Sequence, residues 1–224
     1  MKNIKIDFSK HKLISPLAAD YISGRDFLKQ FYKYRPAVDS VPEIIKDKSN
    51  DKIDRNLLAD IIREQYSTLK KSEAVEKNIS LLTSEKTFTV TTGHQLNLFT
   101  GPLYFVYKIV TALKSCQELK RAYPDYNFVP VYWMASEDHD FEEISFFRLN
   151  GKKFIWKTEQ QGPVGRFQLN ELKILLKEIP GALEPFKGAY EKSQNLADAV
   201  RRYVNDLFGA EGLIVIDEIG RAHV

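Results

Sequence analysis

The sequence predicts an α/β fold built on a parallel sheet, with a helical segment before the sheet and a helical insertion within it. Three observations support this prediction. A strand, a helix and a second strand follow one another within residues 86–134, a third apolar strand occupies residues 212–217, and the first 85 residues have helical periodicity. The chain stops soon after the third strand, so we expect a sheet that is truncated at the C-terminus.

Helical periodicity dominates residues 1–85. Apolar residues recur at helical spacing over residues 16–34, and Arg35-Pro36 then disfavours further helix. Residues 54–82 form a longer amphipathic stretch in which Asp54 is a candidate N-cap. We expect this amino-terminal segment to be mostly helical, to pack on the core and to contain no catalytic residues.

The core begins at residue 86 with a strand–helix–strand unit. Thr87–Thr91 is β-branched and aromatic, which is typical of a strand. Pro102 suits the first turn of a helix that continues to about Arg121. Asn127–Met134 is mostly apolar, which predicts a second strand buried on both faces. Such a unit is expected to be parallel, with a right-handed crossover.

A β-hairpin is predicted after this unit. Asn150-Gly151 separates two strand-like runs at residues 144–149 and 153–158. Asn and Gly adopt the left-handed conformations that a two-residue hairpin loop requires. The dipeptide therefore marks the position of the turn.

Two helical stretches and a last strand complete the predicted core, which ends at residue 217. The helical stretches are residues 168–178 and 186–208, split by Pro180-Gly181. A strand in an α/β sheet is normally followed by a covering helix. Because none follows here, we expect a truncated chain in which residues 218–224 form a non-native tail.

Composition and charge argue against several classes of protein. The 224 residues are 43% hydrophobic and 28% charged, as in an ordinary globular domain. The net charge of +3 is the balance of 33 basic and 30 acidic residues spread along the chain, so we predict no nucleic-acid or membrane partner. The first residues lack the apolar core of a signal peptide, and no apolar run approaches the ~20 residues of a membrane span. We therefore expect a cytoplasmic protein that acts on small molecules.

A first polar cluster lies between the strand at Thr87–Thr91 and the helix at Pro102. Its first glycine permits an unusual backbone angle or the close approach of a ligand. The start of the helix adds free N–H groups and a partial positive charge, so the cluster suits a phosphate or a carboxylate. The alternative is that these side chains only hold a tight turn together. The candidate residues are Gly93, His94, Gln95, Asn97, Thr100 and Gly101.

A second polar cluster follows the strand at Asn127–Met134. Acids around a histidine can hold an amine, bind a metal ion or raise a carboxyl pKa for acid–base chemistry. The alternative is a solvated acidic loop that caps the next element. Since the carboxyl ends of neighbouring parallel strands meet at one sheet edge, we expect both clusters to form one ligand site. The candidates here are Glu137, Asp138, His139 and Asp140.

The two histidines also allow a metal site by residue type. His94 and His139, with Asp138 or Asp140, supply nitrogen and oxygen ligands. Their spacing matches no metal-binding motif. We therefore predict no metal ion.

Three further residues are weaker candidates. Cys116 lies in the predicted helix among lysines and has no histidine placed to activate it, so we expect a packing or surface residue. Arg166 in the Gly-rich loop is either an anion contact or an ordinary exposed arginine. Asp217 is an acid at a strand end and is a lesser candidate for the same site.

Two long motifs carry a family resemblance. TGHQLNLFTGP at residues 92–102 and PVYWMASEDHD at residues 130–140 resemble the bacillithiol-synthesis cysteine-adding enzymes, the BshC family. The resemblance extends over the chain to about Asp217. It matches the amino-terminal portion of that family.

The resemblance implies a function and a fold. It implies a cysteine ligase that joins the carboxyl of cysteine to the amine of glucosamine-malate, the last step of bacillithiol synthesis. It also implies a Rossmann-like core similar to that of class I aminoacyl-tRNA synthetases, so a nucleotide cofactor, ATP or ADP, is expected by analogy only. Complete family members are longer and form homodimers through a carboxyl-terminal coiled coil that this sequence lacks.

The resemblance also gives the two clusters separate roles. The first would position an activated carboxyl or a phosphate through His94, Gln95, Asn97 and Thr100. The second would bind the amine or act as the base through Glu137, Asp138, His139 and Asp140. Two alternatives remain: a non-catalytic Rossmann-like module that binds a nucleotide or sugar acid, and a metal-dependent hydrolase.

Overall fold

The structure is a computed structural model that describes residues 14–179 and 186–218. It divides the chain into two compact units, Met1–Asp51 and Lys52–Val224, and each is described by itself. Most of the predicted tail, residues 219–224, lies outside the described residues, as does the predicted break at Pro180-Gly181. Within the described part of the chain, no helix is long and apolar enough to cross a membrane.

The first unit consists of short helices, as predicted for residues 16–34. Ser15 is the N-cap of helix α1, and its hydroxyl accepts a hydrogen bond from the Ala18 N–H at 3.3 Å. Gly24, with φ of 70°, is the C-cap. Serine before proline and glycine after the last turn are the expected boundaries of such a helix. The helices of this unit are α1 (Pro16–Ser23), η2 (Asp26–Phe31), η3 (Val38–Ser40) and α2 (Val41–Lys48).

The second unit opens with two helices where the sequence predicted one helical region at residues 54–82. They are α3 (Arg55–Gln65) and α4 (Glu73–Leu81). Asp54 caps α3 as predicted, accepting from the Leu57 N–H at 2.9 Å. Ser72 accepts from the Val75 N–H at 3.1 Å and so begins a new helix. This second cap is the physical reason for the interruption.

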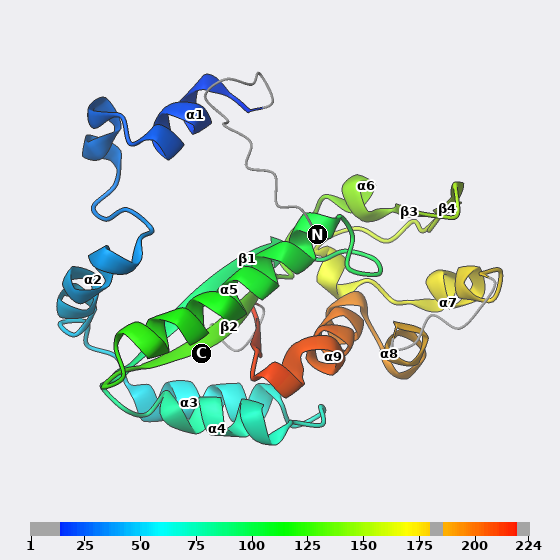
Figure 1. The fold of residues 1–224 in the computed structure, drawn as a ribbon. Helices are drawn as coiled ribbons and strands as arrows, with labels where there is room; N and C mark the ends of the chain where they lie inside the picture. Colours follow the sequence, from blue (N-terminus) through cyan, green and yellow to red (C-terminus); the bar gives the residue numbers. More distant parts are fainter. Residues whose placement is uncertain (1–13, 180–185, 219–224) are drawn as a thin grey trace. The chain divides into compact units, whose positions relative to one another are not determined.

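The sheet contains three parallel strands in the order β1–β2–β5 (Figure 1). They are β1 (Thr87–Gln95), β2 (Asn127–Ala135) and β5 (Ile214–Asp217), and α5 (Leu103–Ala122) connects the first two. The predicted parallel α/β arrangement is therefore confirmed. Strand β1 is longer than predicted because it pairs with β2 without interruption from Thr87↔Asn127 to Gln95↔Ala135.

A hairpin and several helices lie between β2 and β5. The hairpin is confirmed: Asn150 and Gly151 have φ of 50° and 80°, and Leu149 pairs with Lys152 across this two-residue loop. The predicted single helix at residues 186–208 is instead two helices, because the Asn195 side chain accepts from the Asp198 N–H at 2.8 Å and begins a second one. These elements are α6 (Phe141–Ile144), β3 (Phe146–Leu149), β4 (Lys152–Ile155), η4 (Val164–Arg166), α7 (Asn170–Leu176), α8 (Phe186–Lys192), α9 (Leu196–Phe208) and η5 (Gly209–Glu211).

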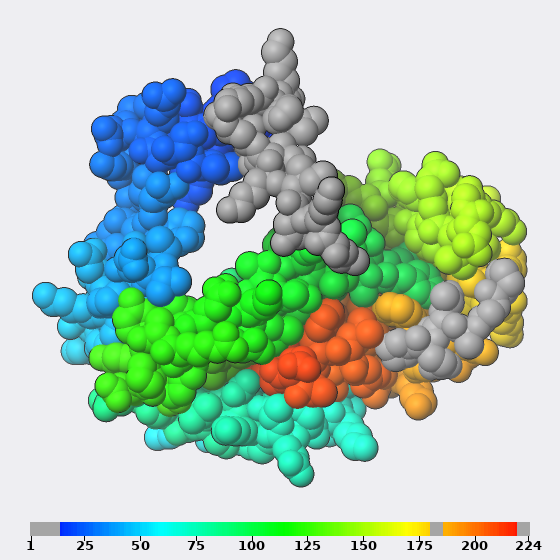
Figure 2. All heavy atoms as spheres, viewed as in Figure 1, coloured from blue at the N-terminus to red at the C-terminus, as the bar shows by residue number. Residues whose placement is uncertain are grey.

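Strand β2 has buried residues on both faces, as its apolar sequence predicted, except that Trp133 is 42% exposed. Val129 and Val131 belong to one core cluster with α3 and α4. Tyr132 and Met134 belong to a second cluster with α5 and α9. Because alternate side chains of a strand point to opposite faces, the sheet is the middle layer between these helices. Figure 2 shows the side chains of α5, in green, forming a band across the face in view.

Candidate functional site

The two polar clusters meet at the carboxyl edge of the sheet, as predicted. The pairing of Gln95 with Ala135 brings the ends of β1 and β2 side by side. The Gln95 side-chain amide then donates a hydrogen bond to the Asp138 carboxylate. One contact therefore joins the two motifs.

His94 lies in the last part of β1 and is half-buried. Its Nδ1 is 2.8 Å from the Gln95 carbonyl oxygen. A carbonyl can only accept, so this nitrogen carries the proton, and Nε2 of the neutral ring is left as an acceptor. The ring lies against Tyr104, with 5.2 Å between ring centroids, and edge-on to Phe105 at 5.4 Å. The contacts fix the imidazole plane and direct one basic nitrogen, an arrangement suited to taking a proton.

Gly93 does not play the part expected from its sequence position. It lies within β1 and is absent from the positive-φ glycines of the described chain. A Cβ there would lie 3.6 Å from the Trp133 carbonyl oxygen, an ordinary contact. Its own carbonyl accepts from Lys108 Nζ at 2.5 Å. Gly93 therefore has the ordinary backbone conformation of a strand residue and not an unusual backbone angle.

The unusual backbone comes later, at Phe99, Thr100 and Gly101. Their φ angles are 53°, 71° and 55°, three successive left-handed residues. A Cβ on Gly101 would lie 2.9 Å from Cβ of Asn97, so this position requires glycine for space as well as for conformation. The turn carries the chain from β1 into α5.

Asn97 holds this turn together. Its side chain is 4% exposed, and the Tyr203 hydroxyl lies 2.9 Å from its backbone oxygen and 3.0 Å from its Oδ1. Burial raises the pKa of Tyr203 well above its usual range, so the hydroxyl stays protonated and can donate. The Phe99 N–H in turn donates to the Tyr190 hydroxyl at 3.0 Å. For Asn97, the turn-stabilising alternative has direct geometric support.

Asp138 is an ionised hydrogen-bond acceptor. Its pKa is lowered chiefly by the hydrogen bond from the Asp140 N–H, at 2.8 Å, and further by the Gln95 side chain and the His139 N–H, against an opposing effect of burial. A general base for an amine needs a raised pKa, which is the opposite direction. Asp138 is therefore better suited to holding a positive charge than to removing a proton.

Across residues 14–179 and 186–218, the other members of the acidic cluster make no contact that joins them to the first cluster in the way that Asp138 contacts Gln95. Asp140 caps α6, its carboxylate accepting from the Glu143 N–H at 3.3 Å. His139 is exposed, and Glu137 is half-buried. None of these three residues lines the pocket beside His94. Asp140 thus has the capping role that was the structural alternative for this cluster.

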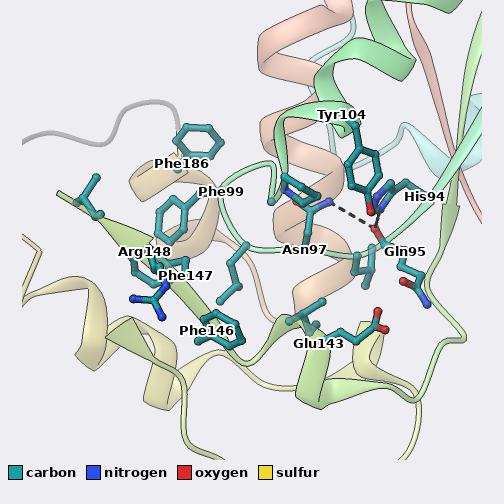
Figure 3. A pocket seen from close by; sticks show the side chains of 16 residues that line it. His94, Gln95, Asn97, Phe99, Tyr104, Glu143, Phe146, Phe147, Arg148 and Phe186 are labelled. Carbon is teal, nitrogen blue, oxygen red and sulfur yellow. Dashed lines mark hydrogen bonds between the residues drawn. The ribbon is translucent and has the colours of Figure 1, made fainter. Parts of the chain in front are cut away.

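A pocket of about 730 Å³ opens beside the first cluster (Figure 3). Most of its wall is apolar, with Phe99, Phe146, Phe147 and Phe186 in view. A largely apolar wall with a few polar groups is typical of small-molecule sites. The polar or charged residues of the lining are His94, Gln95, Asn97, Tyr104, Glu143 and Arg148.

Glu143 belonged to the acidic run but was not among the candidate site residues, and Arg148 was missed by the sequence reasoning. They come from α6 and β3, and they reach the pocket only because the hairpin folds beside the α5 end of the sheet. Their one sequence signal was position, since both lie within ten residues of the acidic motif. Gly101 and Pro102, at the start of α5, also line the pocket.

The three weaker candidates lie away from this pocket. Burial raises the pKa of the Cys116 thiol to about 12, which fits the predicted packing role. Arg166 is exposed, in η4. Asp217 accepts a hydrogen bond from the Ser136 hydroxyl, and its backbone pairs with the Gln65 side chain at 3.1 Å. Among the described residues, no group of three or more His, Cys, Asp or Glu side chains is gathered to hold a metal ion.

Comparison with known proteins gives a consistent result. The family model for "Bacillithiol biosynthesis BshC, N-terminal Rossmann-like domain" matches residues 1–222. A protein of Flavobacterium psychrophilum named "Putative cysteine ligase BshC" is 45% identical over 227 residues, covering 95% of this chain and 42% of its own length. Proteins with the same name from Cytophaga hutchinsonii and Bacillus cereus are 42% and 28% identical, covering 95% and 89% of this chain.

The matched relatives are longer than this chain. The chain spans about two fifths of their length, 42% and 41% in the Flavobacterium psychrophilum and Cytophaga hutchinsonii proteins.

Proposed function

Because the chain belongs to the family of the BshC amino-terminal Rossmann-like domain, we propose that it is part of a ligase that joins cysteine to glucosamine-malate in bacillithiol synthesis. The reaction forms an amide bond between the cysteine carboxyl carbon and the glucosamine nitrogen. The observation that carries the proposal is the position of His94, which lines a mostly apolar pocket while its Nδ1 is held by the Gln95 carbonyl.

His94 acts as the general base in this proposal. An ammonium cannot attack a carbonyl, so the amine must lose a proton before or during attack. With Nδ1–H donating to the Gln95 carbonyl, Nε2 accepts that proton and the resulting imidazolium keeps its orientation. Tyr104 and Phe105 hold the ring in place. The same proton can then pass to the oxygen that leaves the carboxyl carbon.

Asp138 is a positioning residue in this proposal. Its ionised carboxylate accepts from Gln95, the residue whose carbonyl orients His94. It thereby keeps the end of β1 in register with the loop after β2. The negative charge also favours the arrival of a protonated amine at this edge of the sheet.

Two residues of the pocket wall suit the charged groups of the substrates. Arg148 is the residue we assign to the malyl carboxylates, since guanidinium groups bind carboxylates through paired hydrogen bonds. Glu143 is the residue we assign to an ammonium group. Figure 3 shows Arg148, from β3, across the pocket from His94, and Glu143, from α6, below Gln95.

The described lining does not fit a nucleoside triphosphate by itself. Among the lining residues within the described ranges, Arg148 is the one permanent cation, and Glu143 adds a negative charge. A triphosphate carries several negative charges and is usually held by several cations or a metal ion. No step of the proposed mechanism therefore passes through a nucleotide. The cysteine carboxyl is taken as already activated as a mixed anhydride with phosphate, and phosphate leaves with its oxygen when the amine attacks the carboxyl carbon.

The test uses the complete protein with glucosamine-malate and with cysteine supplied as its carboxyl-activated mixed anhydride with phosphate, and mass spectrometry measures the amide product. His94→Gln should lower kcat by about 10²–10⁴-fold, the usual contribution of a general base. Arg121→Gln, an exposed residue at the end of α5, is the matched control and should turn over normally. Normal turnover by both His94→Gln and Asp138→Asn would reject the assignment.

Calorimetry separates the ligase from a non-catalytic binding module. A module binds glucosamine-malate or a nucleotide but forms no amide in the complete protein. The ligase forms the amide, and His94→Gln retains substrate binding while losing turnover. Dimerisation through a coiled coil stays a prediction for the complete protein.

A further inference from the structure

A second pocket, of about 240 Å³, lies between the segment after α3 and the start of α9. It shares no lining residue with the pocket beside His94. Its polar side chains are concentrated on the α9 side. The lining residues are Thr68, Leu69, Lys192, Ser193, Gln194, Asp198, Arg201 and Arg202.

Arg201 is buried in an unusual way for an arginine. The residue is 8% exposed, and its guanidinium Nε and Nη2 have no hydrogen-bond partner among the described residues. One face of the group lies over the Tyr66 ring, with 4.9 Å from Cζ to the ring centroid. Stacking satisfies the face of a guanidinium but not its edge. Two buried donors of a residue that lines this pocket therefore lack a hydrogen-bond partner among the described residues.

Ser193 is a second buried polar group without a partner. It is 4% exposed, and its Oγ contacts no hydrogen-bond partner within the described chain. Its backbone carbonyl accepts from Lys173 Nζ at 3.0 Å, which fixes the residue in place. Arg202 contributes a further buried, unpartnered Nε. Buried polar atoms are normally paired, so several unpaired donors around one pocket indicate a missing acceptor.

The charges around this pocket favour an anion. Lys192, Arg201 and Arg202 oppose a single lining acid, Asp198. Burial lowers the pKa of the Arg201 guanidinium, and the nearby Tyr66, Asp217 and Asp198 act in the opposite direction. A buried cation is stabilised by an anion that also accepts its hydrogen bonds.

We propose that this pocket is a binding site for a small oxyanion, held by Arg201 Nε and Nη2, Arg202 Nε and the Ser193 hydroxyl. The ligand supplies acceptor oxygens only, because the arginine nitrogens are all donors. A phosphate group and a carboxylate group share this chemistry. The proposal is independent of the ligase assignment, since it uses none of the residues of the His94 pocket.

The test titrates this chain with inorganic phosphate and, separately, with malonate, and follows the Arg Nε–Hε signals by NMR together with thermal unfolding. We expect saturable shifts of the Arg201 and Arg202 signals and a concentration-dependent rise in Tm. Tighter binding of phosphate identifies a phosphoryl site, and tighter binding of malonate identifies a carboxylate site. No saturable shift with either anion would overturn the proposal.

Variants locate the binding within the protein. Arg201→Met should weaken anion binding at least tenfold and abolish the rise in Tm, and Ser193→Ala should weaken it several-fold. Arg121→Gln should bind like the wild-type chain, because it removes an equal charge far from the pocket. If Arg201→Met fails to fold, the anion affinities of Ser193→Ala and Arg202→Gln test the site, and both should be lower than that of the wild-type chain. Unchanged affinity in these variants would place the anion elsewhere and reject the site.

Discussion

The side-chain amide of Gln95 donates a hydrogen bond to the carboxylate of Asp138, 43 residues along the chain. Gln95 ends β1 and Asp138 follows β2, so the contact closes the carboxyl edge of the sheet. The same Asp138 accepts from the Asp140 N–H at 2.8 Å. Both contacts need the carboxylate form, and its ionisation is therefore linked to the stability of this edge.

Asp138→Asn should change how stability depends on pH. The folded pKa of Asp138 is lowered from 3.8, so the ionised group stabilises the fold above about 3.8 and this contribution is lost as the pH falls through the folded value. Because the group is only partly buried, solvent screens it and the contribution should stay below about 1 kcal/mol. Urea unfolding should show wild type and variant converging at low pH. Asp125→Asn, an exposed acid in the turn before β2, is the control, and parallel curves for Asp138→Asn would contradict the linkage.

Gly101→Ala should destabilise the turn between β1 and α5. A left-handed φ of 55° costs an L-residue roughly 1–2 kcal/mol, and the new Cβ would lie 2.9 Å from that of Asn97. Gly151→Ala is the matched control, since Gly151 has φ of 80° but no heavy atom near the new Cβ. The drop in Tm should be larger for Gly101→Ala. Equal drops would show that the Asn97 contact is unimportant.

Tyr203→Phe should destabilise the same turn from the α9 side. The change leaves both oxygens of the buried Asn97 without this donor. An unsatisfied buried polar group costs about 1–3 kcal/mol. Chemical denaturation measures the change. Tyr107→Phe, which removes a hydroxyl from a residue that is 64% exposed, should have no measurable effect.

Arg148→Gln should raise the KM for glucosamine-malate in the complete protein. A charge-assisted hydrogen bond contributes about 1.5–3 kcal/mol, which corresponds to roughly 10–100-fold in affinity. The kcat should change little, since Arg148 lies on the binding side of the pocket. Steady-state kinetics with Arg148→Lys, which keeps the charge and loses the paired donors, should give an intermediate KM. An unchanged KM in Arg148→Gln would remove Arg148 from the substrate site.

Local sequence signals determined much of the fold. Asp54 at the start of α3 and Asn150-Gly151 in the hairpin act through their own backbone neighbours, so their effect is visible in the sequence. The apolar run of β2 predicted burial on both faces because alternate residues had to meet helices on each side. The order of strand, helix and strand also predicted that both polar motifs lie at one sheet edge, because parallel strands end at the same edge.

Only the tertiary structure decided how the individual side chains are used. Strand pairing with β2 kept Gly93, His94 and Gln95 in β1, where the sequence suggested a turn. Tyr203, from α9, donates a hydrogen bond to the buried Asn97 and so holds the turn in place. The fold of the hairpin brings Arg148 into the pocket wall. These outcomes depend on contacts between residues far apart in the chain, and one sequence contains no local pattern that encodes such contacts. For the same reason, the unpaired guanidinium of Arg201 could be found only in the folded chain.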